Sequence, residues 1–367
     1  MEFNEKWLYR LALKLIPGIG DKLYKVLIAN CGSAREVFRE RPVLLARIPG
    51  IGPKSIKGFS SASALQRAEE ELRFMERNLV RAWFYLDSDY PERLKWCDDG
   101  PAILFYKGSL KPNRNPMLAV VGTRSATAYG REFCDRFIGD LRAYDPVIVS
   151  GLAYGIDISA HRAAMHNNLA TLAVLGHGLD RIYPFMHRRD ARNMQEKGAI
   201  ITEFMSGVLP DRENFPKRNR IVAGMCDAVV VVEAAKRGGA LITAEIANSY
   251  NREVFAVPGR LGDKYAEGCN FLIKTNKASL LSGVRDLEYL LNWQKKSTGG
   301  SQQKLFLELP PSEDELYQFL RGQREAMPLS AICSGLGKPV SKVLQLLMSL
   351  ELKNLARSLP GQMYTIN

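Results

Sequence analysis

Short apolar runs alternate with amphipathic stretches through the middle of the chain. The runs contain three to five residues each, and they are Met117–Val121, Val147–Val149, Thr171–Leu175, Ala199–Thr202, Ala228–Val232 and Val254–Val257. Helical patterns separate them, and near-continuous apolar strands between helices are typical of a parallel sheet covered on both faces. The pattern therefore predicts an α/β fold with a Rossmann-like, doubly wound, mostly parallel sheet. Such sheets bind ligands at the carboxyl ends of their strands.

Residues 1–78 have helical patterns and contain a repeated turn. The sequence Ile-Pro-Gly-Ile-Gly occurs at residues 16–20 and again at residues 48–52. Its glycines let the backbone approach closely and leave amide groups pointing outward at a helix N-terminus. Two helical hairpins are implied, similar to the helix-hairpin-helix or SAM-like module, which holds DNA backbone without reading bases.

Whether these turns contact DNA is open, because Pro-Gly-x-Gly also simply makes a tight turn. Lys54 and Lys57 follow the second turn and favour contact with phosphates, whereas Asp21 follows the first turn and weakens it. Both alternatives, contact with the DNA backbone and a purely structural turn, are therefore kept for residues 1–78.

The flanks of the central pattern complete the predicted organisation. Residues 79–115 contain two strand-like pieces, so we expect one extended domain over 79–293.

Residues 294–312 are rich in Ser, Gly, Gln, Lys and Pro, which is typical of a linker. Residues 313–367 show three helical patterns, at 313–320, 330–335 and 340–350, and a hairpin pattern at 356–366. Three helices and a hairpin resemble a winged helix, which binds DNA or serves for protein docking.

Composition and charge narrow the class of partner. Hydrophobic residues make up 46% and charged residues 25% of the chain, as in a globular protein, and no apolar run approaches the ~20 residues that span a bilayer. The first residues lack the features of a secretory signal, so we expect a cytoplasmic protein with no membrane partner. The net charge of +12 attracts polyanions. The six cysteines are widely spaced, which predicts reduced thiols and no zinc site.

Two glycine-rich turns follow the first two central strands. Gly122, Thr123 and Arg124 follow the first strand, and Ser150 and Gly151 follow the second. Each turn leads into a helix, where a phosphate can lie against backbone amides while Arg124 supplies charge. The Gly-x-Gly-x-x-Gly pattern is missing, so we expect no dinucleotide cofactor. Two such turns on adjacent strands predict an anion site.

A basic segment lies just ahead of a helix expected to start near Ile221. It is formed by Phe215, Pro216, Lys217, Arg218, Asn219 and Arg220. The aromatic ring can stack on a base, and the guanidinium groups can bind phosphate oxygens. The alternative is a solvated basic loop with one arginine that anchors the fold.

A second candidate chemistry comes from the loop after the fifth strand. Gly238 to Glu245, with Glu233 at the end of the strand, is partly similar to the Gly-Gly-x-Gly-Thr-x-x-Glu loop of nucleotide phosphoribohydrolases. A nucleotide-binding or nucleoside-monophosphate-hydrolysing enzyme is therefore the alternative function. We predict structural roles for the four histidines, with a hydrogen bond between Asp157 and His161, and neither a catalytic residue nor a metal site.

Taken in order, several of these segments resemble the DNA-processing protein A (DprA/Smf) family. They are Val121–Arg124, Ser150–Asp157 with His161, Gly178–Asp180 with Tyr183-Pro184, Phe215–Arg220 and Ala256–Gly259. Asp89–Pro91 and Lys107-Gly108 resemble the family's entry segment. A helical N-terminal module and a C-terminal winged helix also occur in the family, so the resemblance covers the whole chain.

The resemblance implies a protein that is not an enzyme and needs no cofactor. Such a protein binds and protects single-stranded DNA, forms a homodimer through its Rossmann-like domain and loads a RecA-type recombinase during natural transformation in competent cells. The family's DNA-contacting arginine falls on Arg124 and its basic element on Phe215 to Arg220. The residues we predict to bind DNA are Gly122, Thr123, Arg124, Ser150, Gly151, Phe215, Lys217, Arg218, Asn219 and Arg220.

Overall fold

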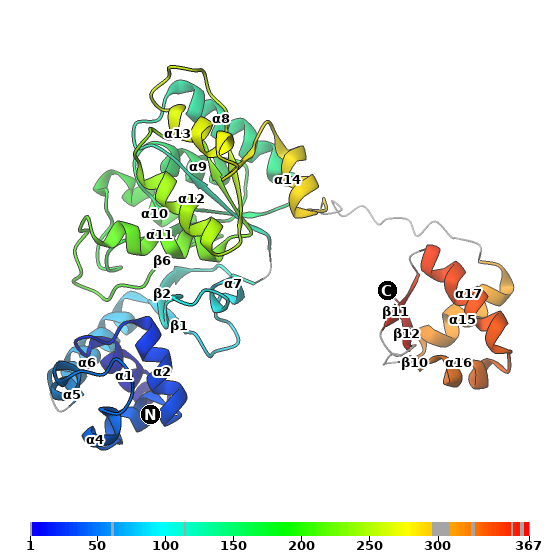
Figure 1. Ribbon diagram of the computed structural model, residues 1–367, viewed down its shortest axis with the longest axis horizontal. Coiled ribbons are helices and arrows are strands. Elements are labelled where there is room, and N and C mark those ends of the chain that lie inside the picture. The colour runs from blue at the N-terminus through cyan, green and yellow to red at the C-terminus, as the bar shows by residue number, and fades with distance from the viewer. Residues whose placement is uncertain are drawn as a thin grey trace. The chain divides into compact units, whose positions relative to one another are not determined.

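The computed structural model describes most of the chain as two compact units (Figure 1). The described residues are 2–59, 62–113, 115–295, 309–323, 327–353, 355–359 and 363–366. The units are Met1–Lys296 and Ser297–Asn367, and each is described by itself. Most of the predicted linker, residues 296–308, lies outside the described residues.

The larger unit is built on a sheet that has nine strands within the described residues. The strands are β1 (Arg81–Phe84), β2 (Ile103–Gly108), β3 (Met117–Val121), β4 (Val147–Ser150), β5 (Thr171–Val174), β6 (Ala199–Thr202), β7 (Ala228–Val231), β8 (Glu253–Ala256) and β9 (Ser279–Leu280). Their order is β1-β2-β6-β5-β4-β3-β7-β8-β9, and the strands from β6 to β9 run parallel. The predicted α/β Rossmann-like fold is confirmed.

Strands β1 and β2 extend this sheet at its β6 edge. Strand β2 pairs antiparallel with β6, with Phe105 opposite Thr202, and β1 pairs antiparallel with β2. Strand β9 was not expected, because two residues are too few to show a pattern.

Helices cover both faces of the sheet because its parallel strands are apolar on both sides. Along β3, Met117, Ala119 and Val121 face one core, and Leu118 and Val120 face another. The first face carries α11 (Asn214–Met225), α12 (Gly239–Ser249) and α13 (Glu267–Lys274). The second face carries α8 (Ala128–Asp140), α9 (Ile156–His166), α10 (Arg188–Asn193) and α14 (Val284–Leu291). A short helix, α7 (Glu92–Lys95), lies between β1 and β2 in the sequence.

The N-terminal segment is helical, as the pattern predicts, and packs beside β1 and β2 (Figure 1). Its helices are α1 (Glu2–Leu15), α2 (Asp21–Cys31), α3 (Ala34–Arg39), α4 (Pro42–Leu45), α5 (Pro53–Phe59) and α6 (Ala62–Asn78). The two repeated turns place Gly18 and Gly50 at positive φ, +82° and +91°. They lie against each other, since Ser55 Oγ donates a hydrogen bond of 2.8 Å to Pro17 O.

The smaller unit contains α15 (Pro311–Arg321), β10 (Met327–Pro328), α16 (Leu329–Leu336), α17 (Val340–Leu352), β11 (Ala356–Leu359) and β12 (Met363–Ile366). Its described strands form a sheet in the order β10-β12-β11. Leu316, Ile332 and Leu347 are buried between the helices. Within the described ranges of the whole chain, no helix combines the length and apolarity needed to cross a bilayer.

The predicted hydrogen bond between Asp157 and His161 on α9 is wrong, because it was inferred from their spacing along the helix alone. His161 is fully buried, and its Nδ1 lies 2.6 Å from Thr171 Oγ1 rather than bonding Asp157. The Thr171 hydroxyl donates to Ile148 O, so Nδ1 must carry the proton that it shares with Thr171. Nε2 has no partner among the described residues. Asp157 instead accepts from the amides of Gly151 and Ala153.

We expect His161 to make folding sensitive to mild acid. Burial lowers the pKa of His161 from 6.5 to about 3. Between these values the unfolded chain binds the proton and the folded chain does not, so stability falls as the pH falls below 6.5. The expected slope is about 1.4 kcal/mol per pH unit in the free energy of unfolding. Urea denaturation at several pH values measures this slope.

The matched variant is His161→Asn, which removes the titrating group at this position. Burial also lowers the pKa of His177, so the variant should keep part of the slope. A slope that is identical in both proteins would contradict the assignment to His161.

Candidate nucleic-acid interface

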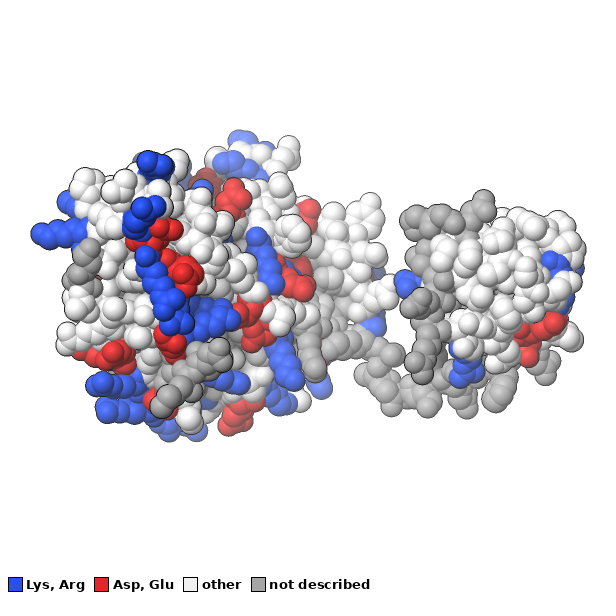
Figure 2. Space-filling view, turned by 90° about the horizontal axis from the view of Figure 1, so that it is seen from below, with Lys and Arg blue, Asp and Glu red and all other residues white. Residues whose placement is uncertain are grey.

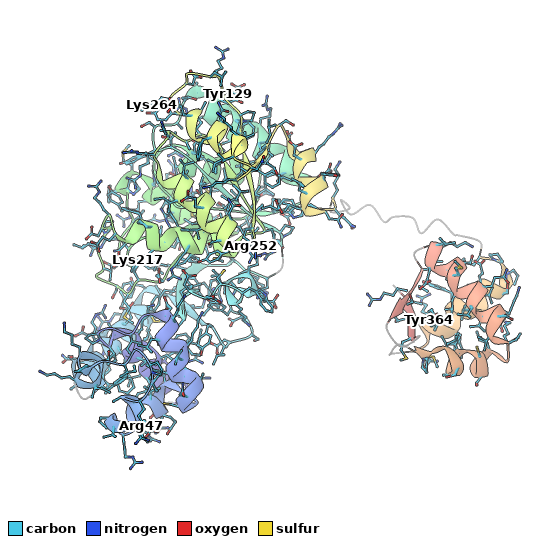
Figure 3. All side chains as sticks on the ribbon, in the orientation of Figure 1. Arg47, Tyr129, Lys217, Arg252, Lys264 and Tyr364 are labelled. Atoms are coloured by element: carbon cyan, nitrogen blue, oxygen red, sulfur yellow. The ribbon has the colours of Figure 1, made fainter. Side chains whose placement is uncertain are left out.

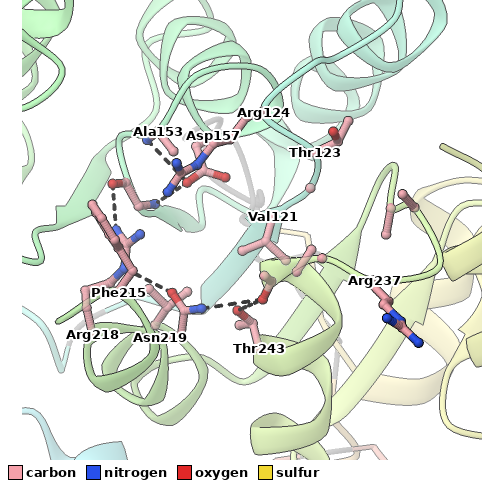
Figure 4. Close-up of a pocket in the computed structure, with 18 residues that line it drawn as sticks. Val121, Thr123, Arg124, Ala153, Asp157, Phe215, Arg218, Asn219, Arg237 and Thr243 are labelled. Atoms are coloured by element: carbon pink, nitrogen blue, oxygen red, sulfur yellow. Dashed lines mark hydrogen bonds between the residues drawn. The ribbon is translucent and has the colours of Figure 1, made fainter. Parts of the chain in front are cut away.

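The carboxyl ends of the parallel strands meet around a pocket at the point where the strand order reverses. β3 has β4 on one side and β7 on the other, and their crossover connections diverge from this point. In open α/β sheets, ligands bind in the crevice at such a point. The pocket has a volume of about 300 Å³ and lies between the loops after β3, β4 and β7 and the first turns of α11 and α12 (Figure 4).

All ten predicted DNA-binding residues lie within the described ranges, and seven of them line this pocket. The seven are Gly122, Thr123, Arg124, Gly151, Phe215, Arg218 and Asn219. Segments almost 100 residues apart therefore converge, as expected if strands β3 and β4 deliver both glycine turns to one edge. Ser150, Lys217 and Arg220 lie elsewhere.

The two glycine turns touch each other, which confirms that they lie side by side. The Ile156 amide donates a hydrogen bond of 3.1 Å to Thr123 O. Gly155 has φ +76°, and a Cβ on it would lie 2.2 Å from Thr123 O. A Cβ on Gly122 would lie 2.5 Å from the Ile156 side chain. Larger residues would therefore push the turns apart.

The basic segment is helical, which corrects the expectation that it precedes a helix near Ile221. α11 begins at Asn214, so Pro216 lies in its first turn, where the missing N–H breaks no hydrogen bond. Side chains three or four positions apart then share a face. Phe215, Arg218 and Asn219 line the pocket together with Val222.

Phe215 forms an aromatic wall that two arginines approach. The Arg124 guanidinium lies 5.1 Å from the Phe215 ring centroid, and that of Arg218 lies 5.8 Å away. These distances are typical of cation–π contacts. Gly176 makes room for the ring, since a Cβ there would lie 3.2 Å from it.

Arg218 is anchored inside the protein. It is 4% exposed, and its Nη1 donates hydrogen bonds of 2.6 Å to Gly151 O and 2.5 Å to Val174 O. Burial lowers the pKa of Arg218 and raises the pKa of Asp157, and the opposite charge of each residue partly offsets the shift of the other. Arg218 thus ties α11 to the ends of β4 and β5.

The other predicted residues point away from the pocket. Arg220 pairs with Glu203 and with Asp21, the latter at 3.0 Å, and so joins α11 to the helical N-terminal segment. Burial alone would raise the pKa of Asp21, but Lys14, the Ala102 amide and Arg220 hold it below its usual value.

Two more of the predicted residues differ in exposure. The Ser150 hydroxyl is fully buried and donates a hydrogen bond of 2.6 Å to Val120 O. Lys217 is exposed at the outer edge of the larger unit (Figure 3).

One cation of the pocket was missed from the sequence. Arg237 is exposed and lies across the pocket from Phe215 and Arg218 (Figure 4). Next to it, α12 begins after Gly238, which provides no side-chain cap, so the positive end of this helix faces the pocket. The pair Lys236-Arg237 in the loop between β7 and α12 was the available signal.

The residues that suggested a hydrolase do not share a cavity. Gly238 and Gly239 line the pocket at the switch point, whereas Glu233 lines a different one. Both Glu233 carboxylate oxygens accept hydrogen bonds from Thr127. Glu245 is exposed and pairs with Lys277 at 3.6 Å. Neither the Glu233 nor the Glu245 carboxylate therefore lies in the pocket that Gly238 and Gly239 line.

Comparisons with known proteins show the family to which this chain belongs. Residues 81–292 match the family described as DNA recombination-mediator protein A. The Synechocystis protein Smf is 32% identical over 98% of this chain and 99% of its own length. This chain belongs to the DNA recombination-mediator protein A family.

Other members support the assignment. The Escherichia coli protein Smf is 37% identical over 81% of this chain and 83% of its own length. The X-ray structure of DNA processing protein A (DprA) from Streptococcus pneumoniae has a TM-score of 0.66 at 33% identity and covers 79% of this chain and 98% of its own. A Helicobacter pylori DNA processing protein A, described by its single-stranded DNA binding mode, has a TM-score of 0.53 at 26% identity over 59% of this chain and 97% of its own. The predicted resemblance to the DprA/Smf family is confirmed.

Proposed function

We propose that this protein binds single-stranded DNA at the switch-point pocket and acts in DNA processing during natural transformation. The observation that carries the proposal is the convergence of Arg124, Phe215 and two glycine turns on one pocket. The single-stranded DNA binding mode described for the Helicobacter pylori relative supports it.

Each part of the pocket suits one part of a nucleotide. Phosphate oxygens fit the positive end of α12 and the guanidinium groups of Arg124 and Arg237. A base fits against Phe215, because an aromatic ring stacks on any base. Arg218 positions Phe215 and the Gly151 turn from inside the protein, and Arg220 fixes the helical segment.

The shape of the pocket favours single strands. A base can enter it only when it is unpaired and unstacked, and separating a base from a duplex costs a few kcal/mol. Titration of a fluorescent oligonucleotide, followed by anisotropy, should therefore show tighter binding to the single strand than to the matched duplex. Equal or tighter binding of the duplex would overturn the proposal.

We also propose domain boundaries at 1–78, 79–293 and 313–367, with a tandem helix-hairpin-helix at the start and a winged helix at the end. Directly after the first turn, the Asp21 carboxylate pairs with Lys14 and Arg220 and accepts a hydrogen bond from the Ala102 amide. After the second turn, Lys54 and Lys57 are exposed on α5. Figure 2 views this end of the larger unit and shows Lys and Arg side chains spread among acidic ones. The second turn is thus the one we expect to touch a DNA backbone.

Removing both lysines should therefore weaken backbone contacts that carry no sequence information. We expect Lys54→Ala with Lys57→Ala to lower affinity for duplex DNA and to reduce the slope of log affinity against log salt by about 1.8, since two phosphate contacts contribute about 0.9 each. The matched control replaces Arg73, which is exposed on α6 and pairs with Glu69 at 3.7 Å. An unchanged slope in the double variant would leave these turns with a structural role alone.

The remaining steps of the proposal concern assembly. By resemblance to its family, the protein protects incoming strands, forms a homodimer and loads a RecA-type recombinase in the cytoplasm, and it does so without catalysing a reaction. Light scattering of the purified chain and a pull-down with a RecA-type recombinase address these two steps.

A further inference from the structure

A second surface beside the pocket combines exposed aromatic and basic side chains. It is formed by residues 181–189 together with Tyr154, and we call it the aromatic–basic loop. Phe185 is 74% and Met186 75% exposed, and Tyr154 and Tyr183 are 43% and 45% exposed. Single exposed apolar residues are common, but four large ones together mark a contact surface.

The loop is held in place by its buried residues, so its exposed side chains are presented to solvent from a fixed backbone. His187 is 4% exposed, and its Nδ1 lies 2.8 Å from Leu152 O. The Tyr154 ring lies 5.1 Å from the His187 ring, centroid to centroid. Pro184 is also buried, and its carbonyl accepts from the His187 amide at 3.0 Å.

The loop is continuous with the pocket through its rings. The Tyr183 ring lies 6.4 Å from the Phe215 ring, centroid to centroid. Phe215 in turn lies 5.1 Å from the Arg124 guanidinium. A strand that leaves the pocket past Phe215 therefore meets Tyr183 first and then Phe185, two residues further along the loop.

The charges of the loop suit a polyanion. Arg188 and Arg189 are exposed, and within the described residues neither forms an ion pair, whereas Arg181 pairs with Asp180 at 2.7 Å. The Arg188 guanidinium lies 5.9 Å from the Phe185 ring. Aromatic platforms interleaved with cations are how proteins follow single strands without reading sequence.

We propose that a single strand bound in the pocket continues over the aromatic–basic loop. Bases stack on Tyr183 and Phe185 while phosphates approach Arg188 and Arg189. This inference rests on the proposed function, which it extends from one pocket to a path for several nucleotides.

The test compares short and long oligothymidylates on the full chain. Oligonucleotides of about 2 nucleotides occupy the pocket and end before Phe185, because the Phe215 and Tyr183 rings already take two successive bases, and those of about 20 nucleotides also cover the loop. Phe185→Ala should weaken binding of the long oligonucleotide by about 5- to 150-fold and leave the short one unchanged, since one base loses its stacking partner. Phe185→Trp should restore the long-oligonucleotide affinity. The matched control is Trp96→Ala, which removes an 85% exposed aromatic that directly follows α7 and lies outside the pocket and the loop.

An Arg124→Ala arm separates failure of this inference from failure of the proposed function. If Arg124→Ala weakens both lengths and Phe185→Ala weakens neither, the strand does not cross the loop and the inference is overturned. If Arg124→Ala also has no effect, the proposed function is overturned. Loss of recombinase binding by Phe185→Ala with unchanged DNA affinity would show a protein-docking surface, which likewise overturns the inference.

Discussion

Replacing Arg218 by methionine should lower the free energy of unfolding of the larger unit by about 3–5 kcal/mol. Arg218 is buried beside Asp157, and its guanidinium serves two backbone carbonyls. Methionine fills similar space but supplies neither the charge nor the donors. Asp157 and the carbonyls of Gly151 and Val174 would then remain buried without Arg218, which is the costly outcome. Urea denaturation measures the change.

The adjacent residue provides the control for this prediction. Lys217→Met removes an exposed cation from the same helix, so we expect a change within about 0.5 kcal/mol. If Arg218→Met were as mild as Lys217→Met, Arg218 would not anchor α11 to the sheet. The segment would then be a solvated basic helix end, and Arg218 would become a direct DNA ligand.

Replacing Arg124 by alanine should weaken binding of single-stranded DNA by about 10- to 150-fold without loss of stability. A hydrogen bond to a charged group contributes about 1.5–3 kcal/mol. The Arg124 side chain is exposed at the pocket and lies 5.1 Å from the Phe215 ring. The Arg124 guanidinium group can therefore bind a phosphate next to a base that stacks on Phe215. Fluorescence anisotropy with a labelled oligothymidylate measures the affinity.

Two further variants sharpen the assignment of Arg124. Arg124→Lys keeps the charge but loses the planar group, so we expect an affinity between those of the native protein and Arg124→Ala. Arg73→Ala removes an exposed arginine from α6 and should leave single-strand affinity close to native. Arg73→Ala weakening binding as much as Arg124→Ala would mean that net charge, not the pocket, controls affinity.

The strands of the central sheet could be predicted because each is a short apolar run buried on both faces. The meeting of the two glycine turns could be predicted as well, because parallel strands place their carboxyl ends at one edge of the sheet. The start of α11 could not be predicted, because Pro216 suggests a helix boundary when only the sequence is read. That error hid the helical spacing, which sends Arg218 into the protein beside the pocket and Arg220 toward Glu203 and Asp21.

Other features of the site depend on contacts between distant segments. Arg237 reaches the pocket only because β7 lies next to β3, an order that local patterns do not contain. The same order assigns Glu233 to a different cavity from Gly238. His161 bonds Thr171 on β5 rather than Asp157, which is nearer in the sequence and lies on the same helix. The sequence thus indicated which residue types form the site, but it did not indicate which residues each of them contacts.

The salt dependence of single-strand binding by the native chain and by Arg124→Ala tests the central claim most directly. Each phosphate that a protein neutralises on a single strand contributes about 0.7 to the slope of log affinity against log salt. If the switch-point pocket holds the backbone through Arg124, the variant should show a slope shallower by about 0.7 and a lower affinity at every salt concentration. Two superimposable lines would contradict a phosphate-binding role for Arg124 and, with it, the placement of DNA in this pocket.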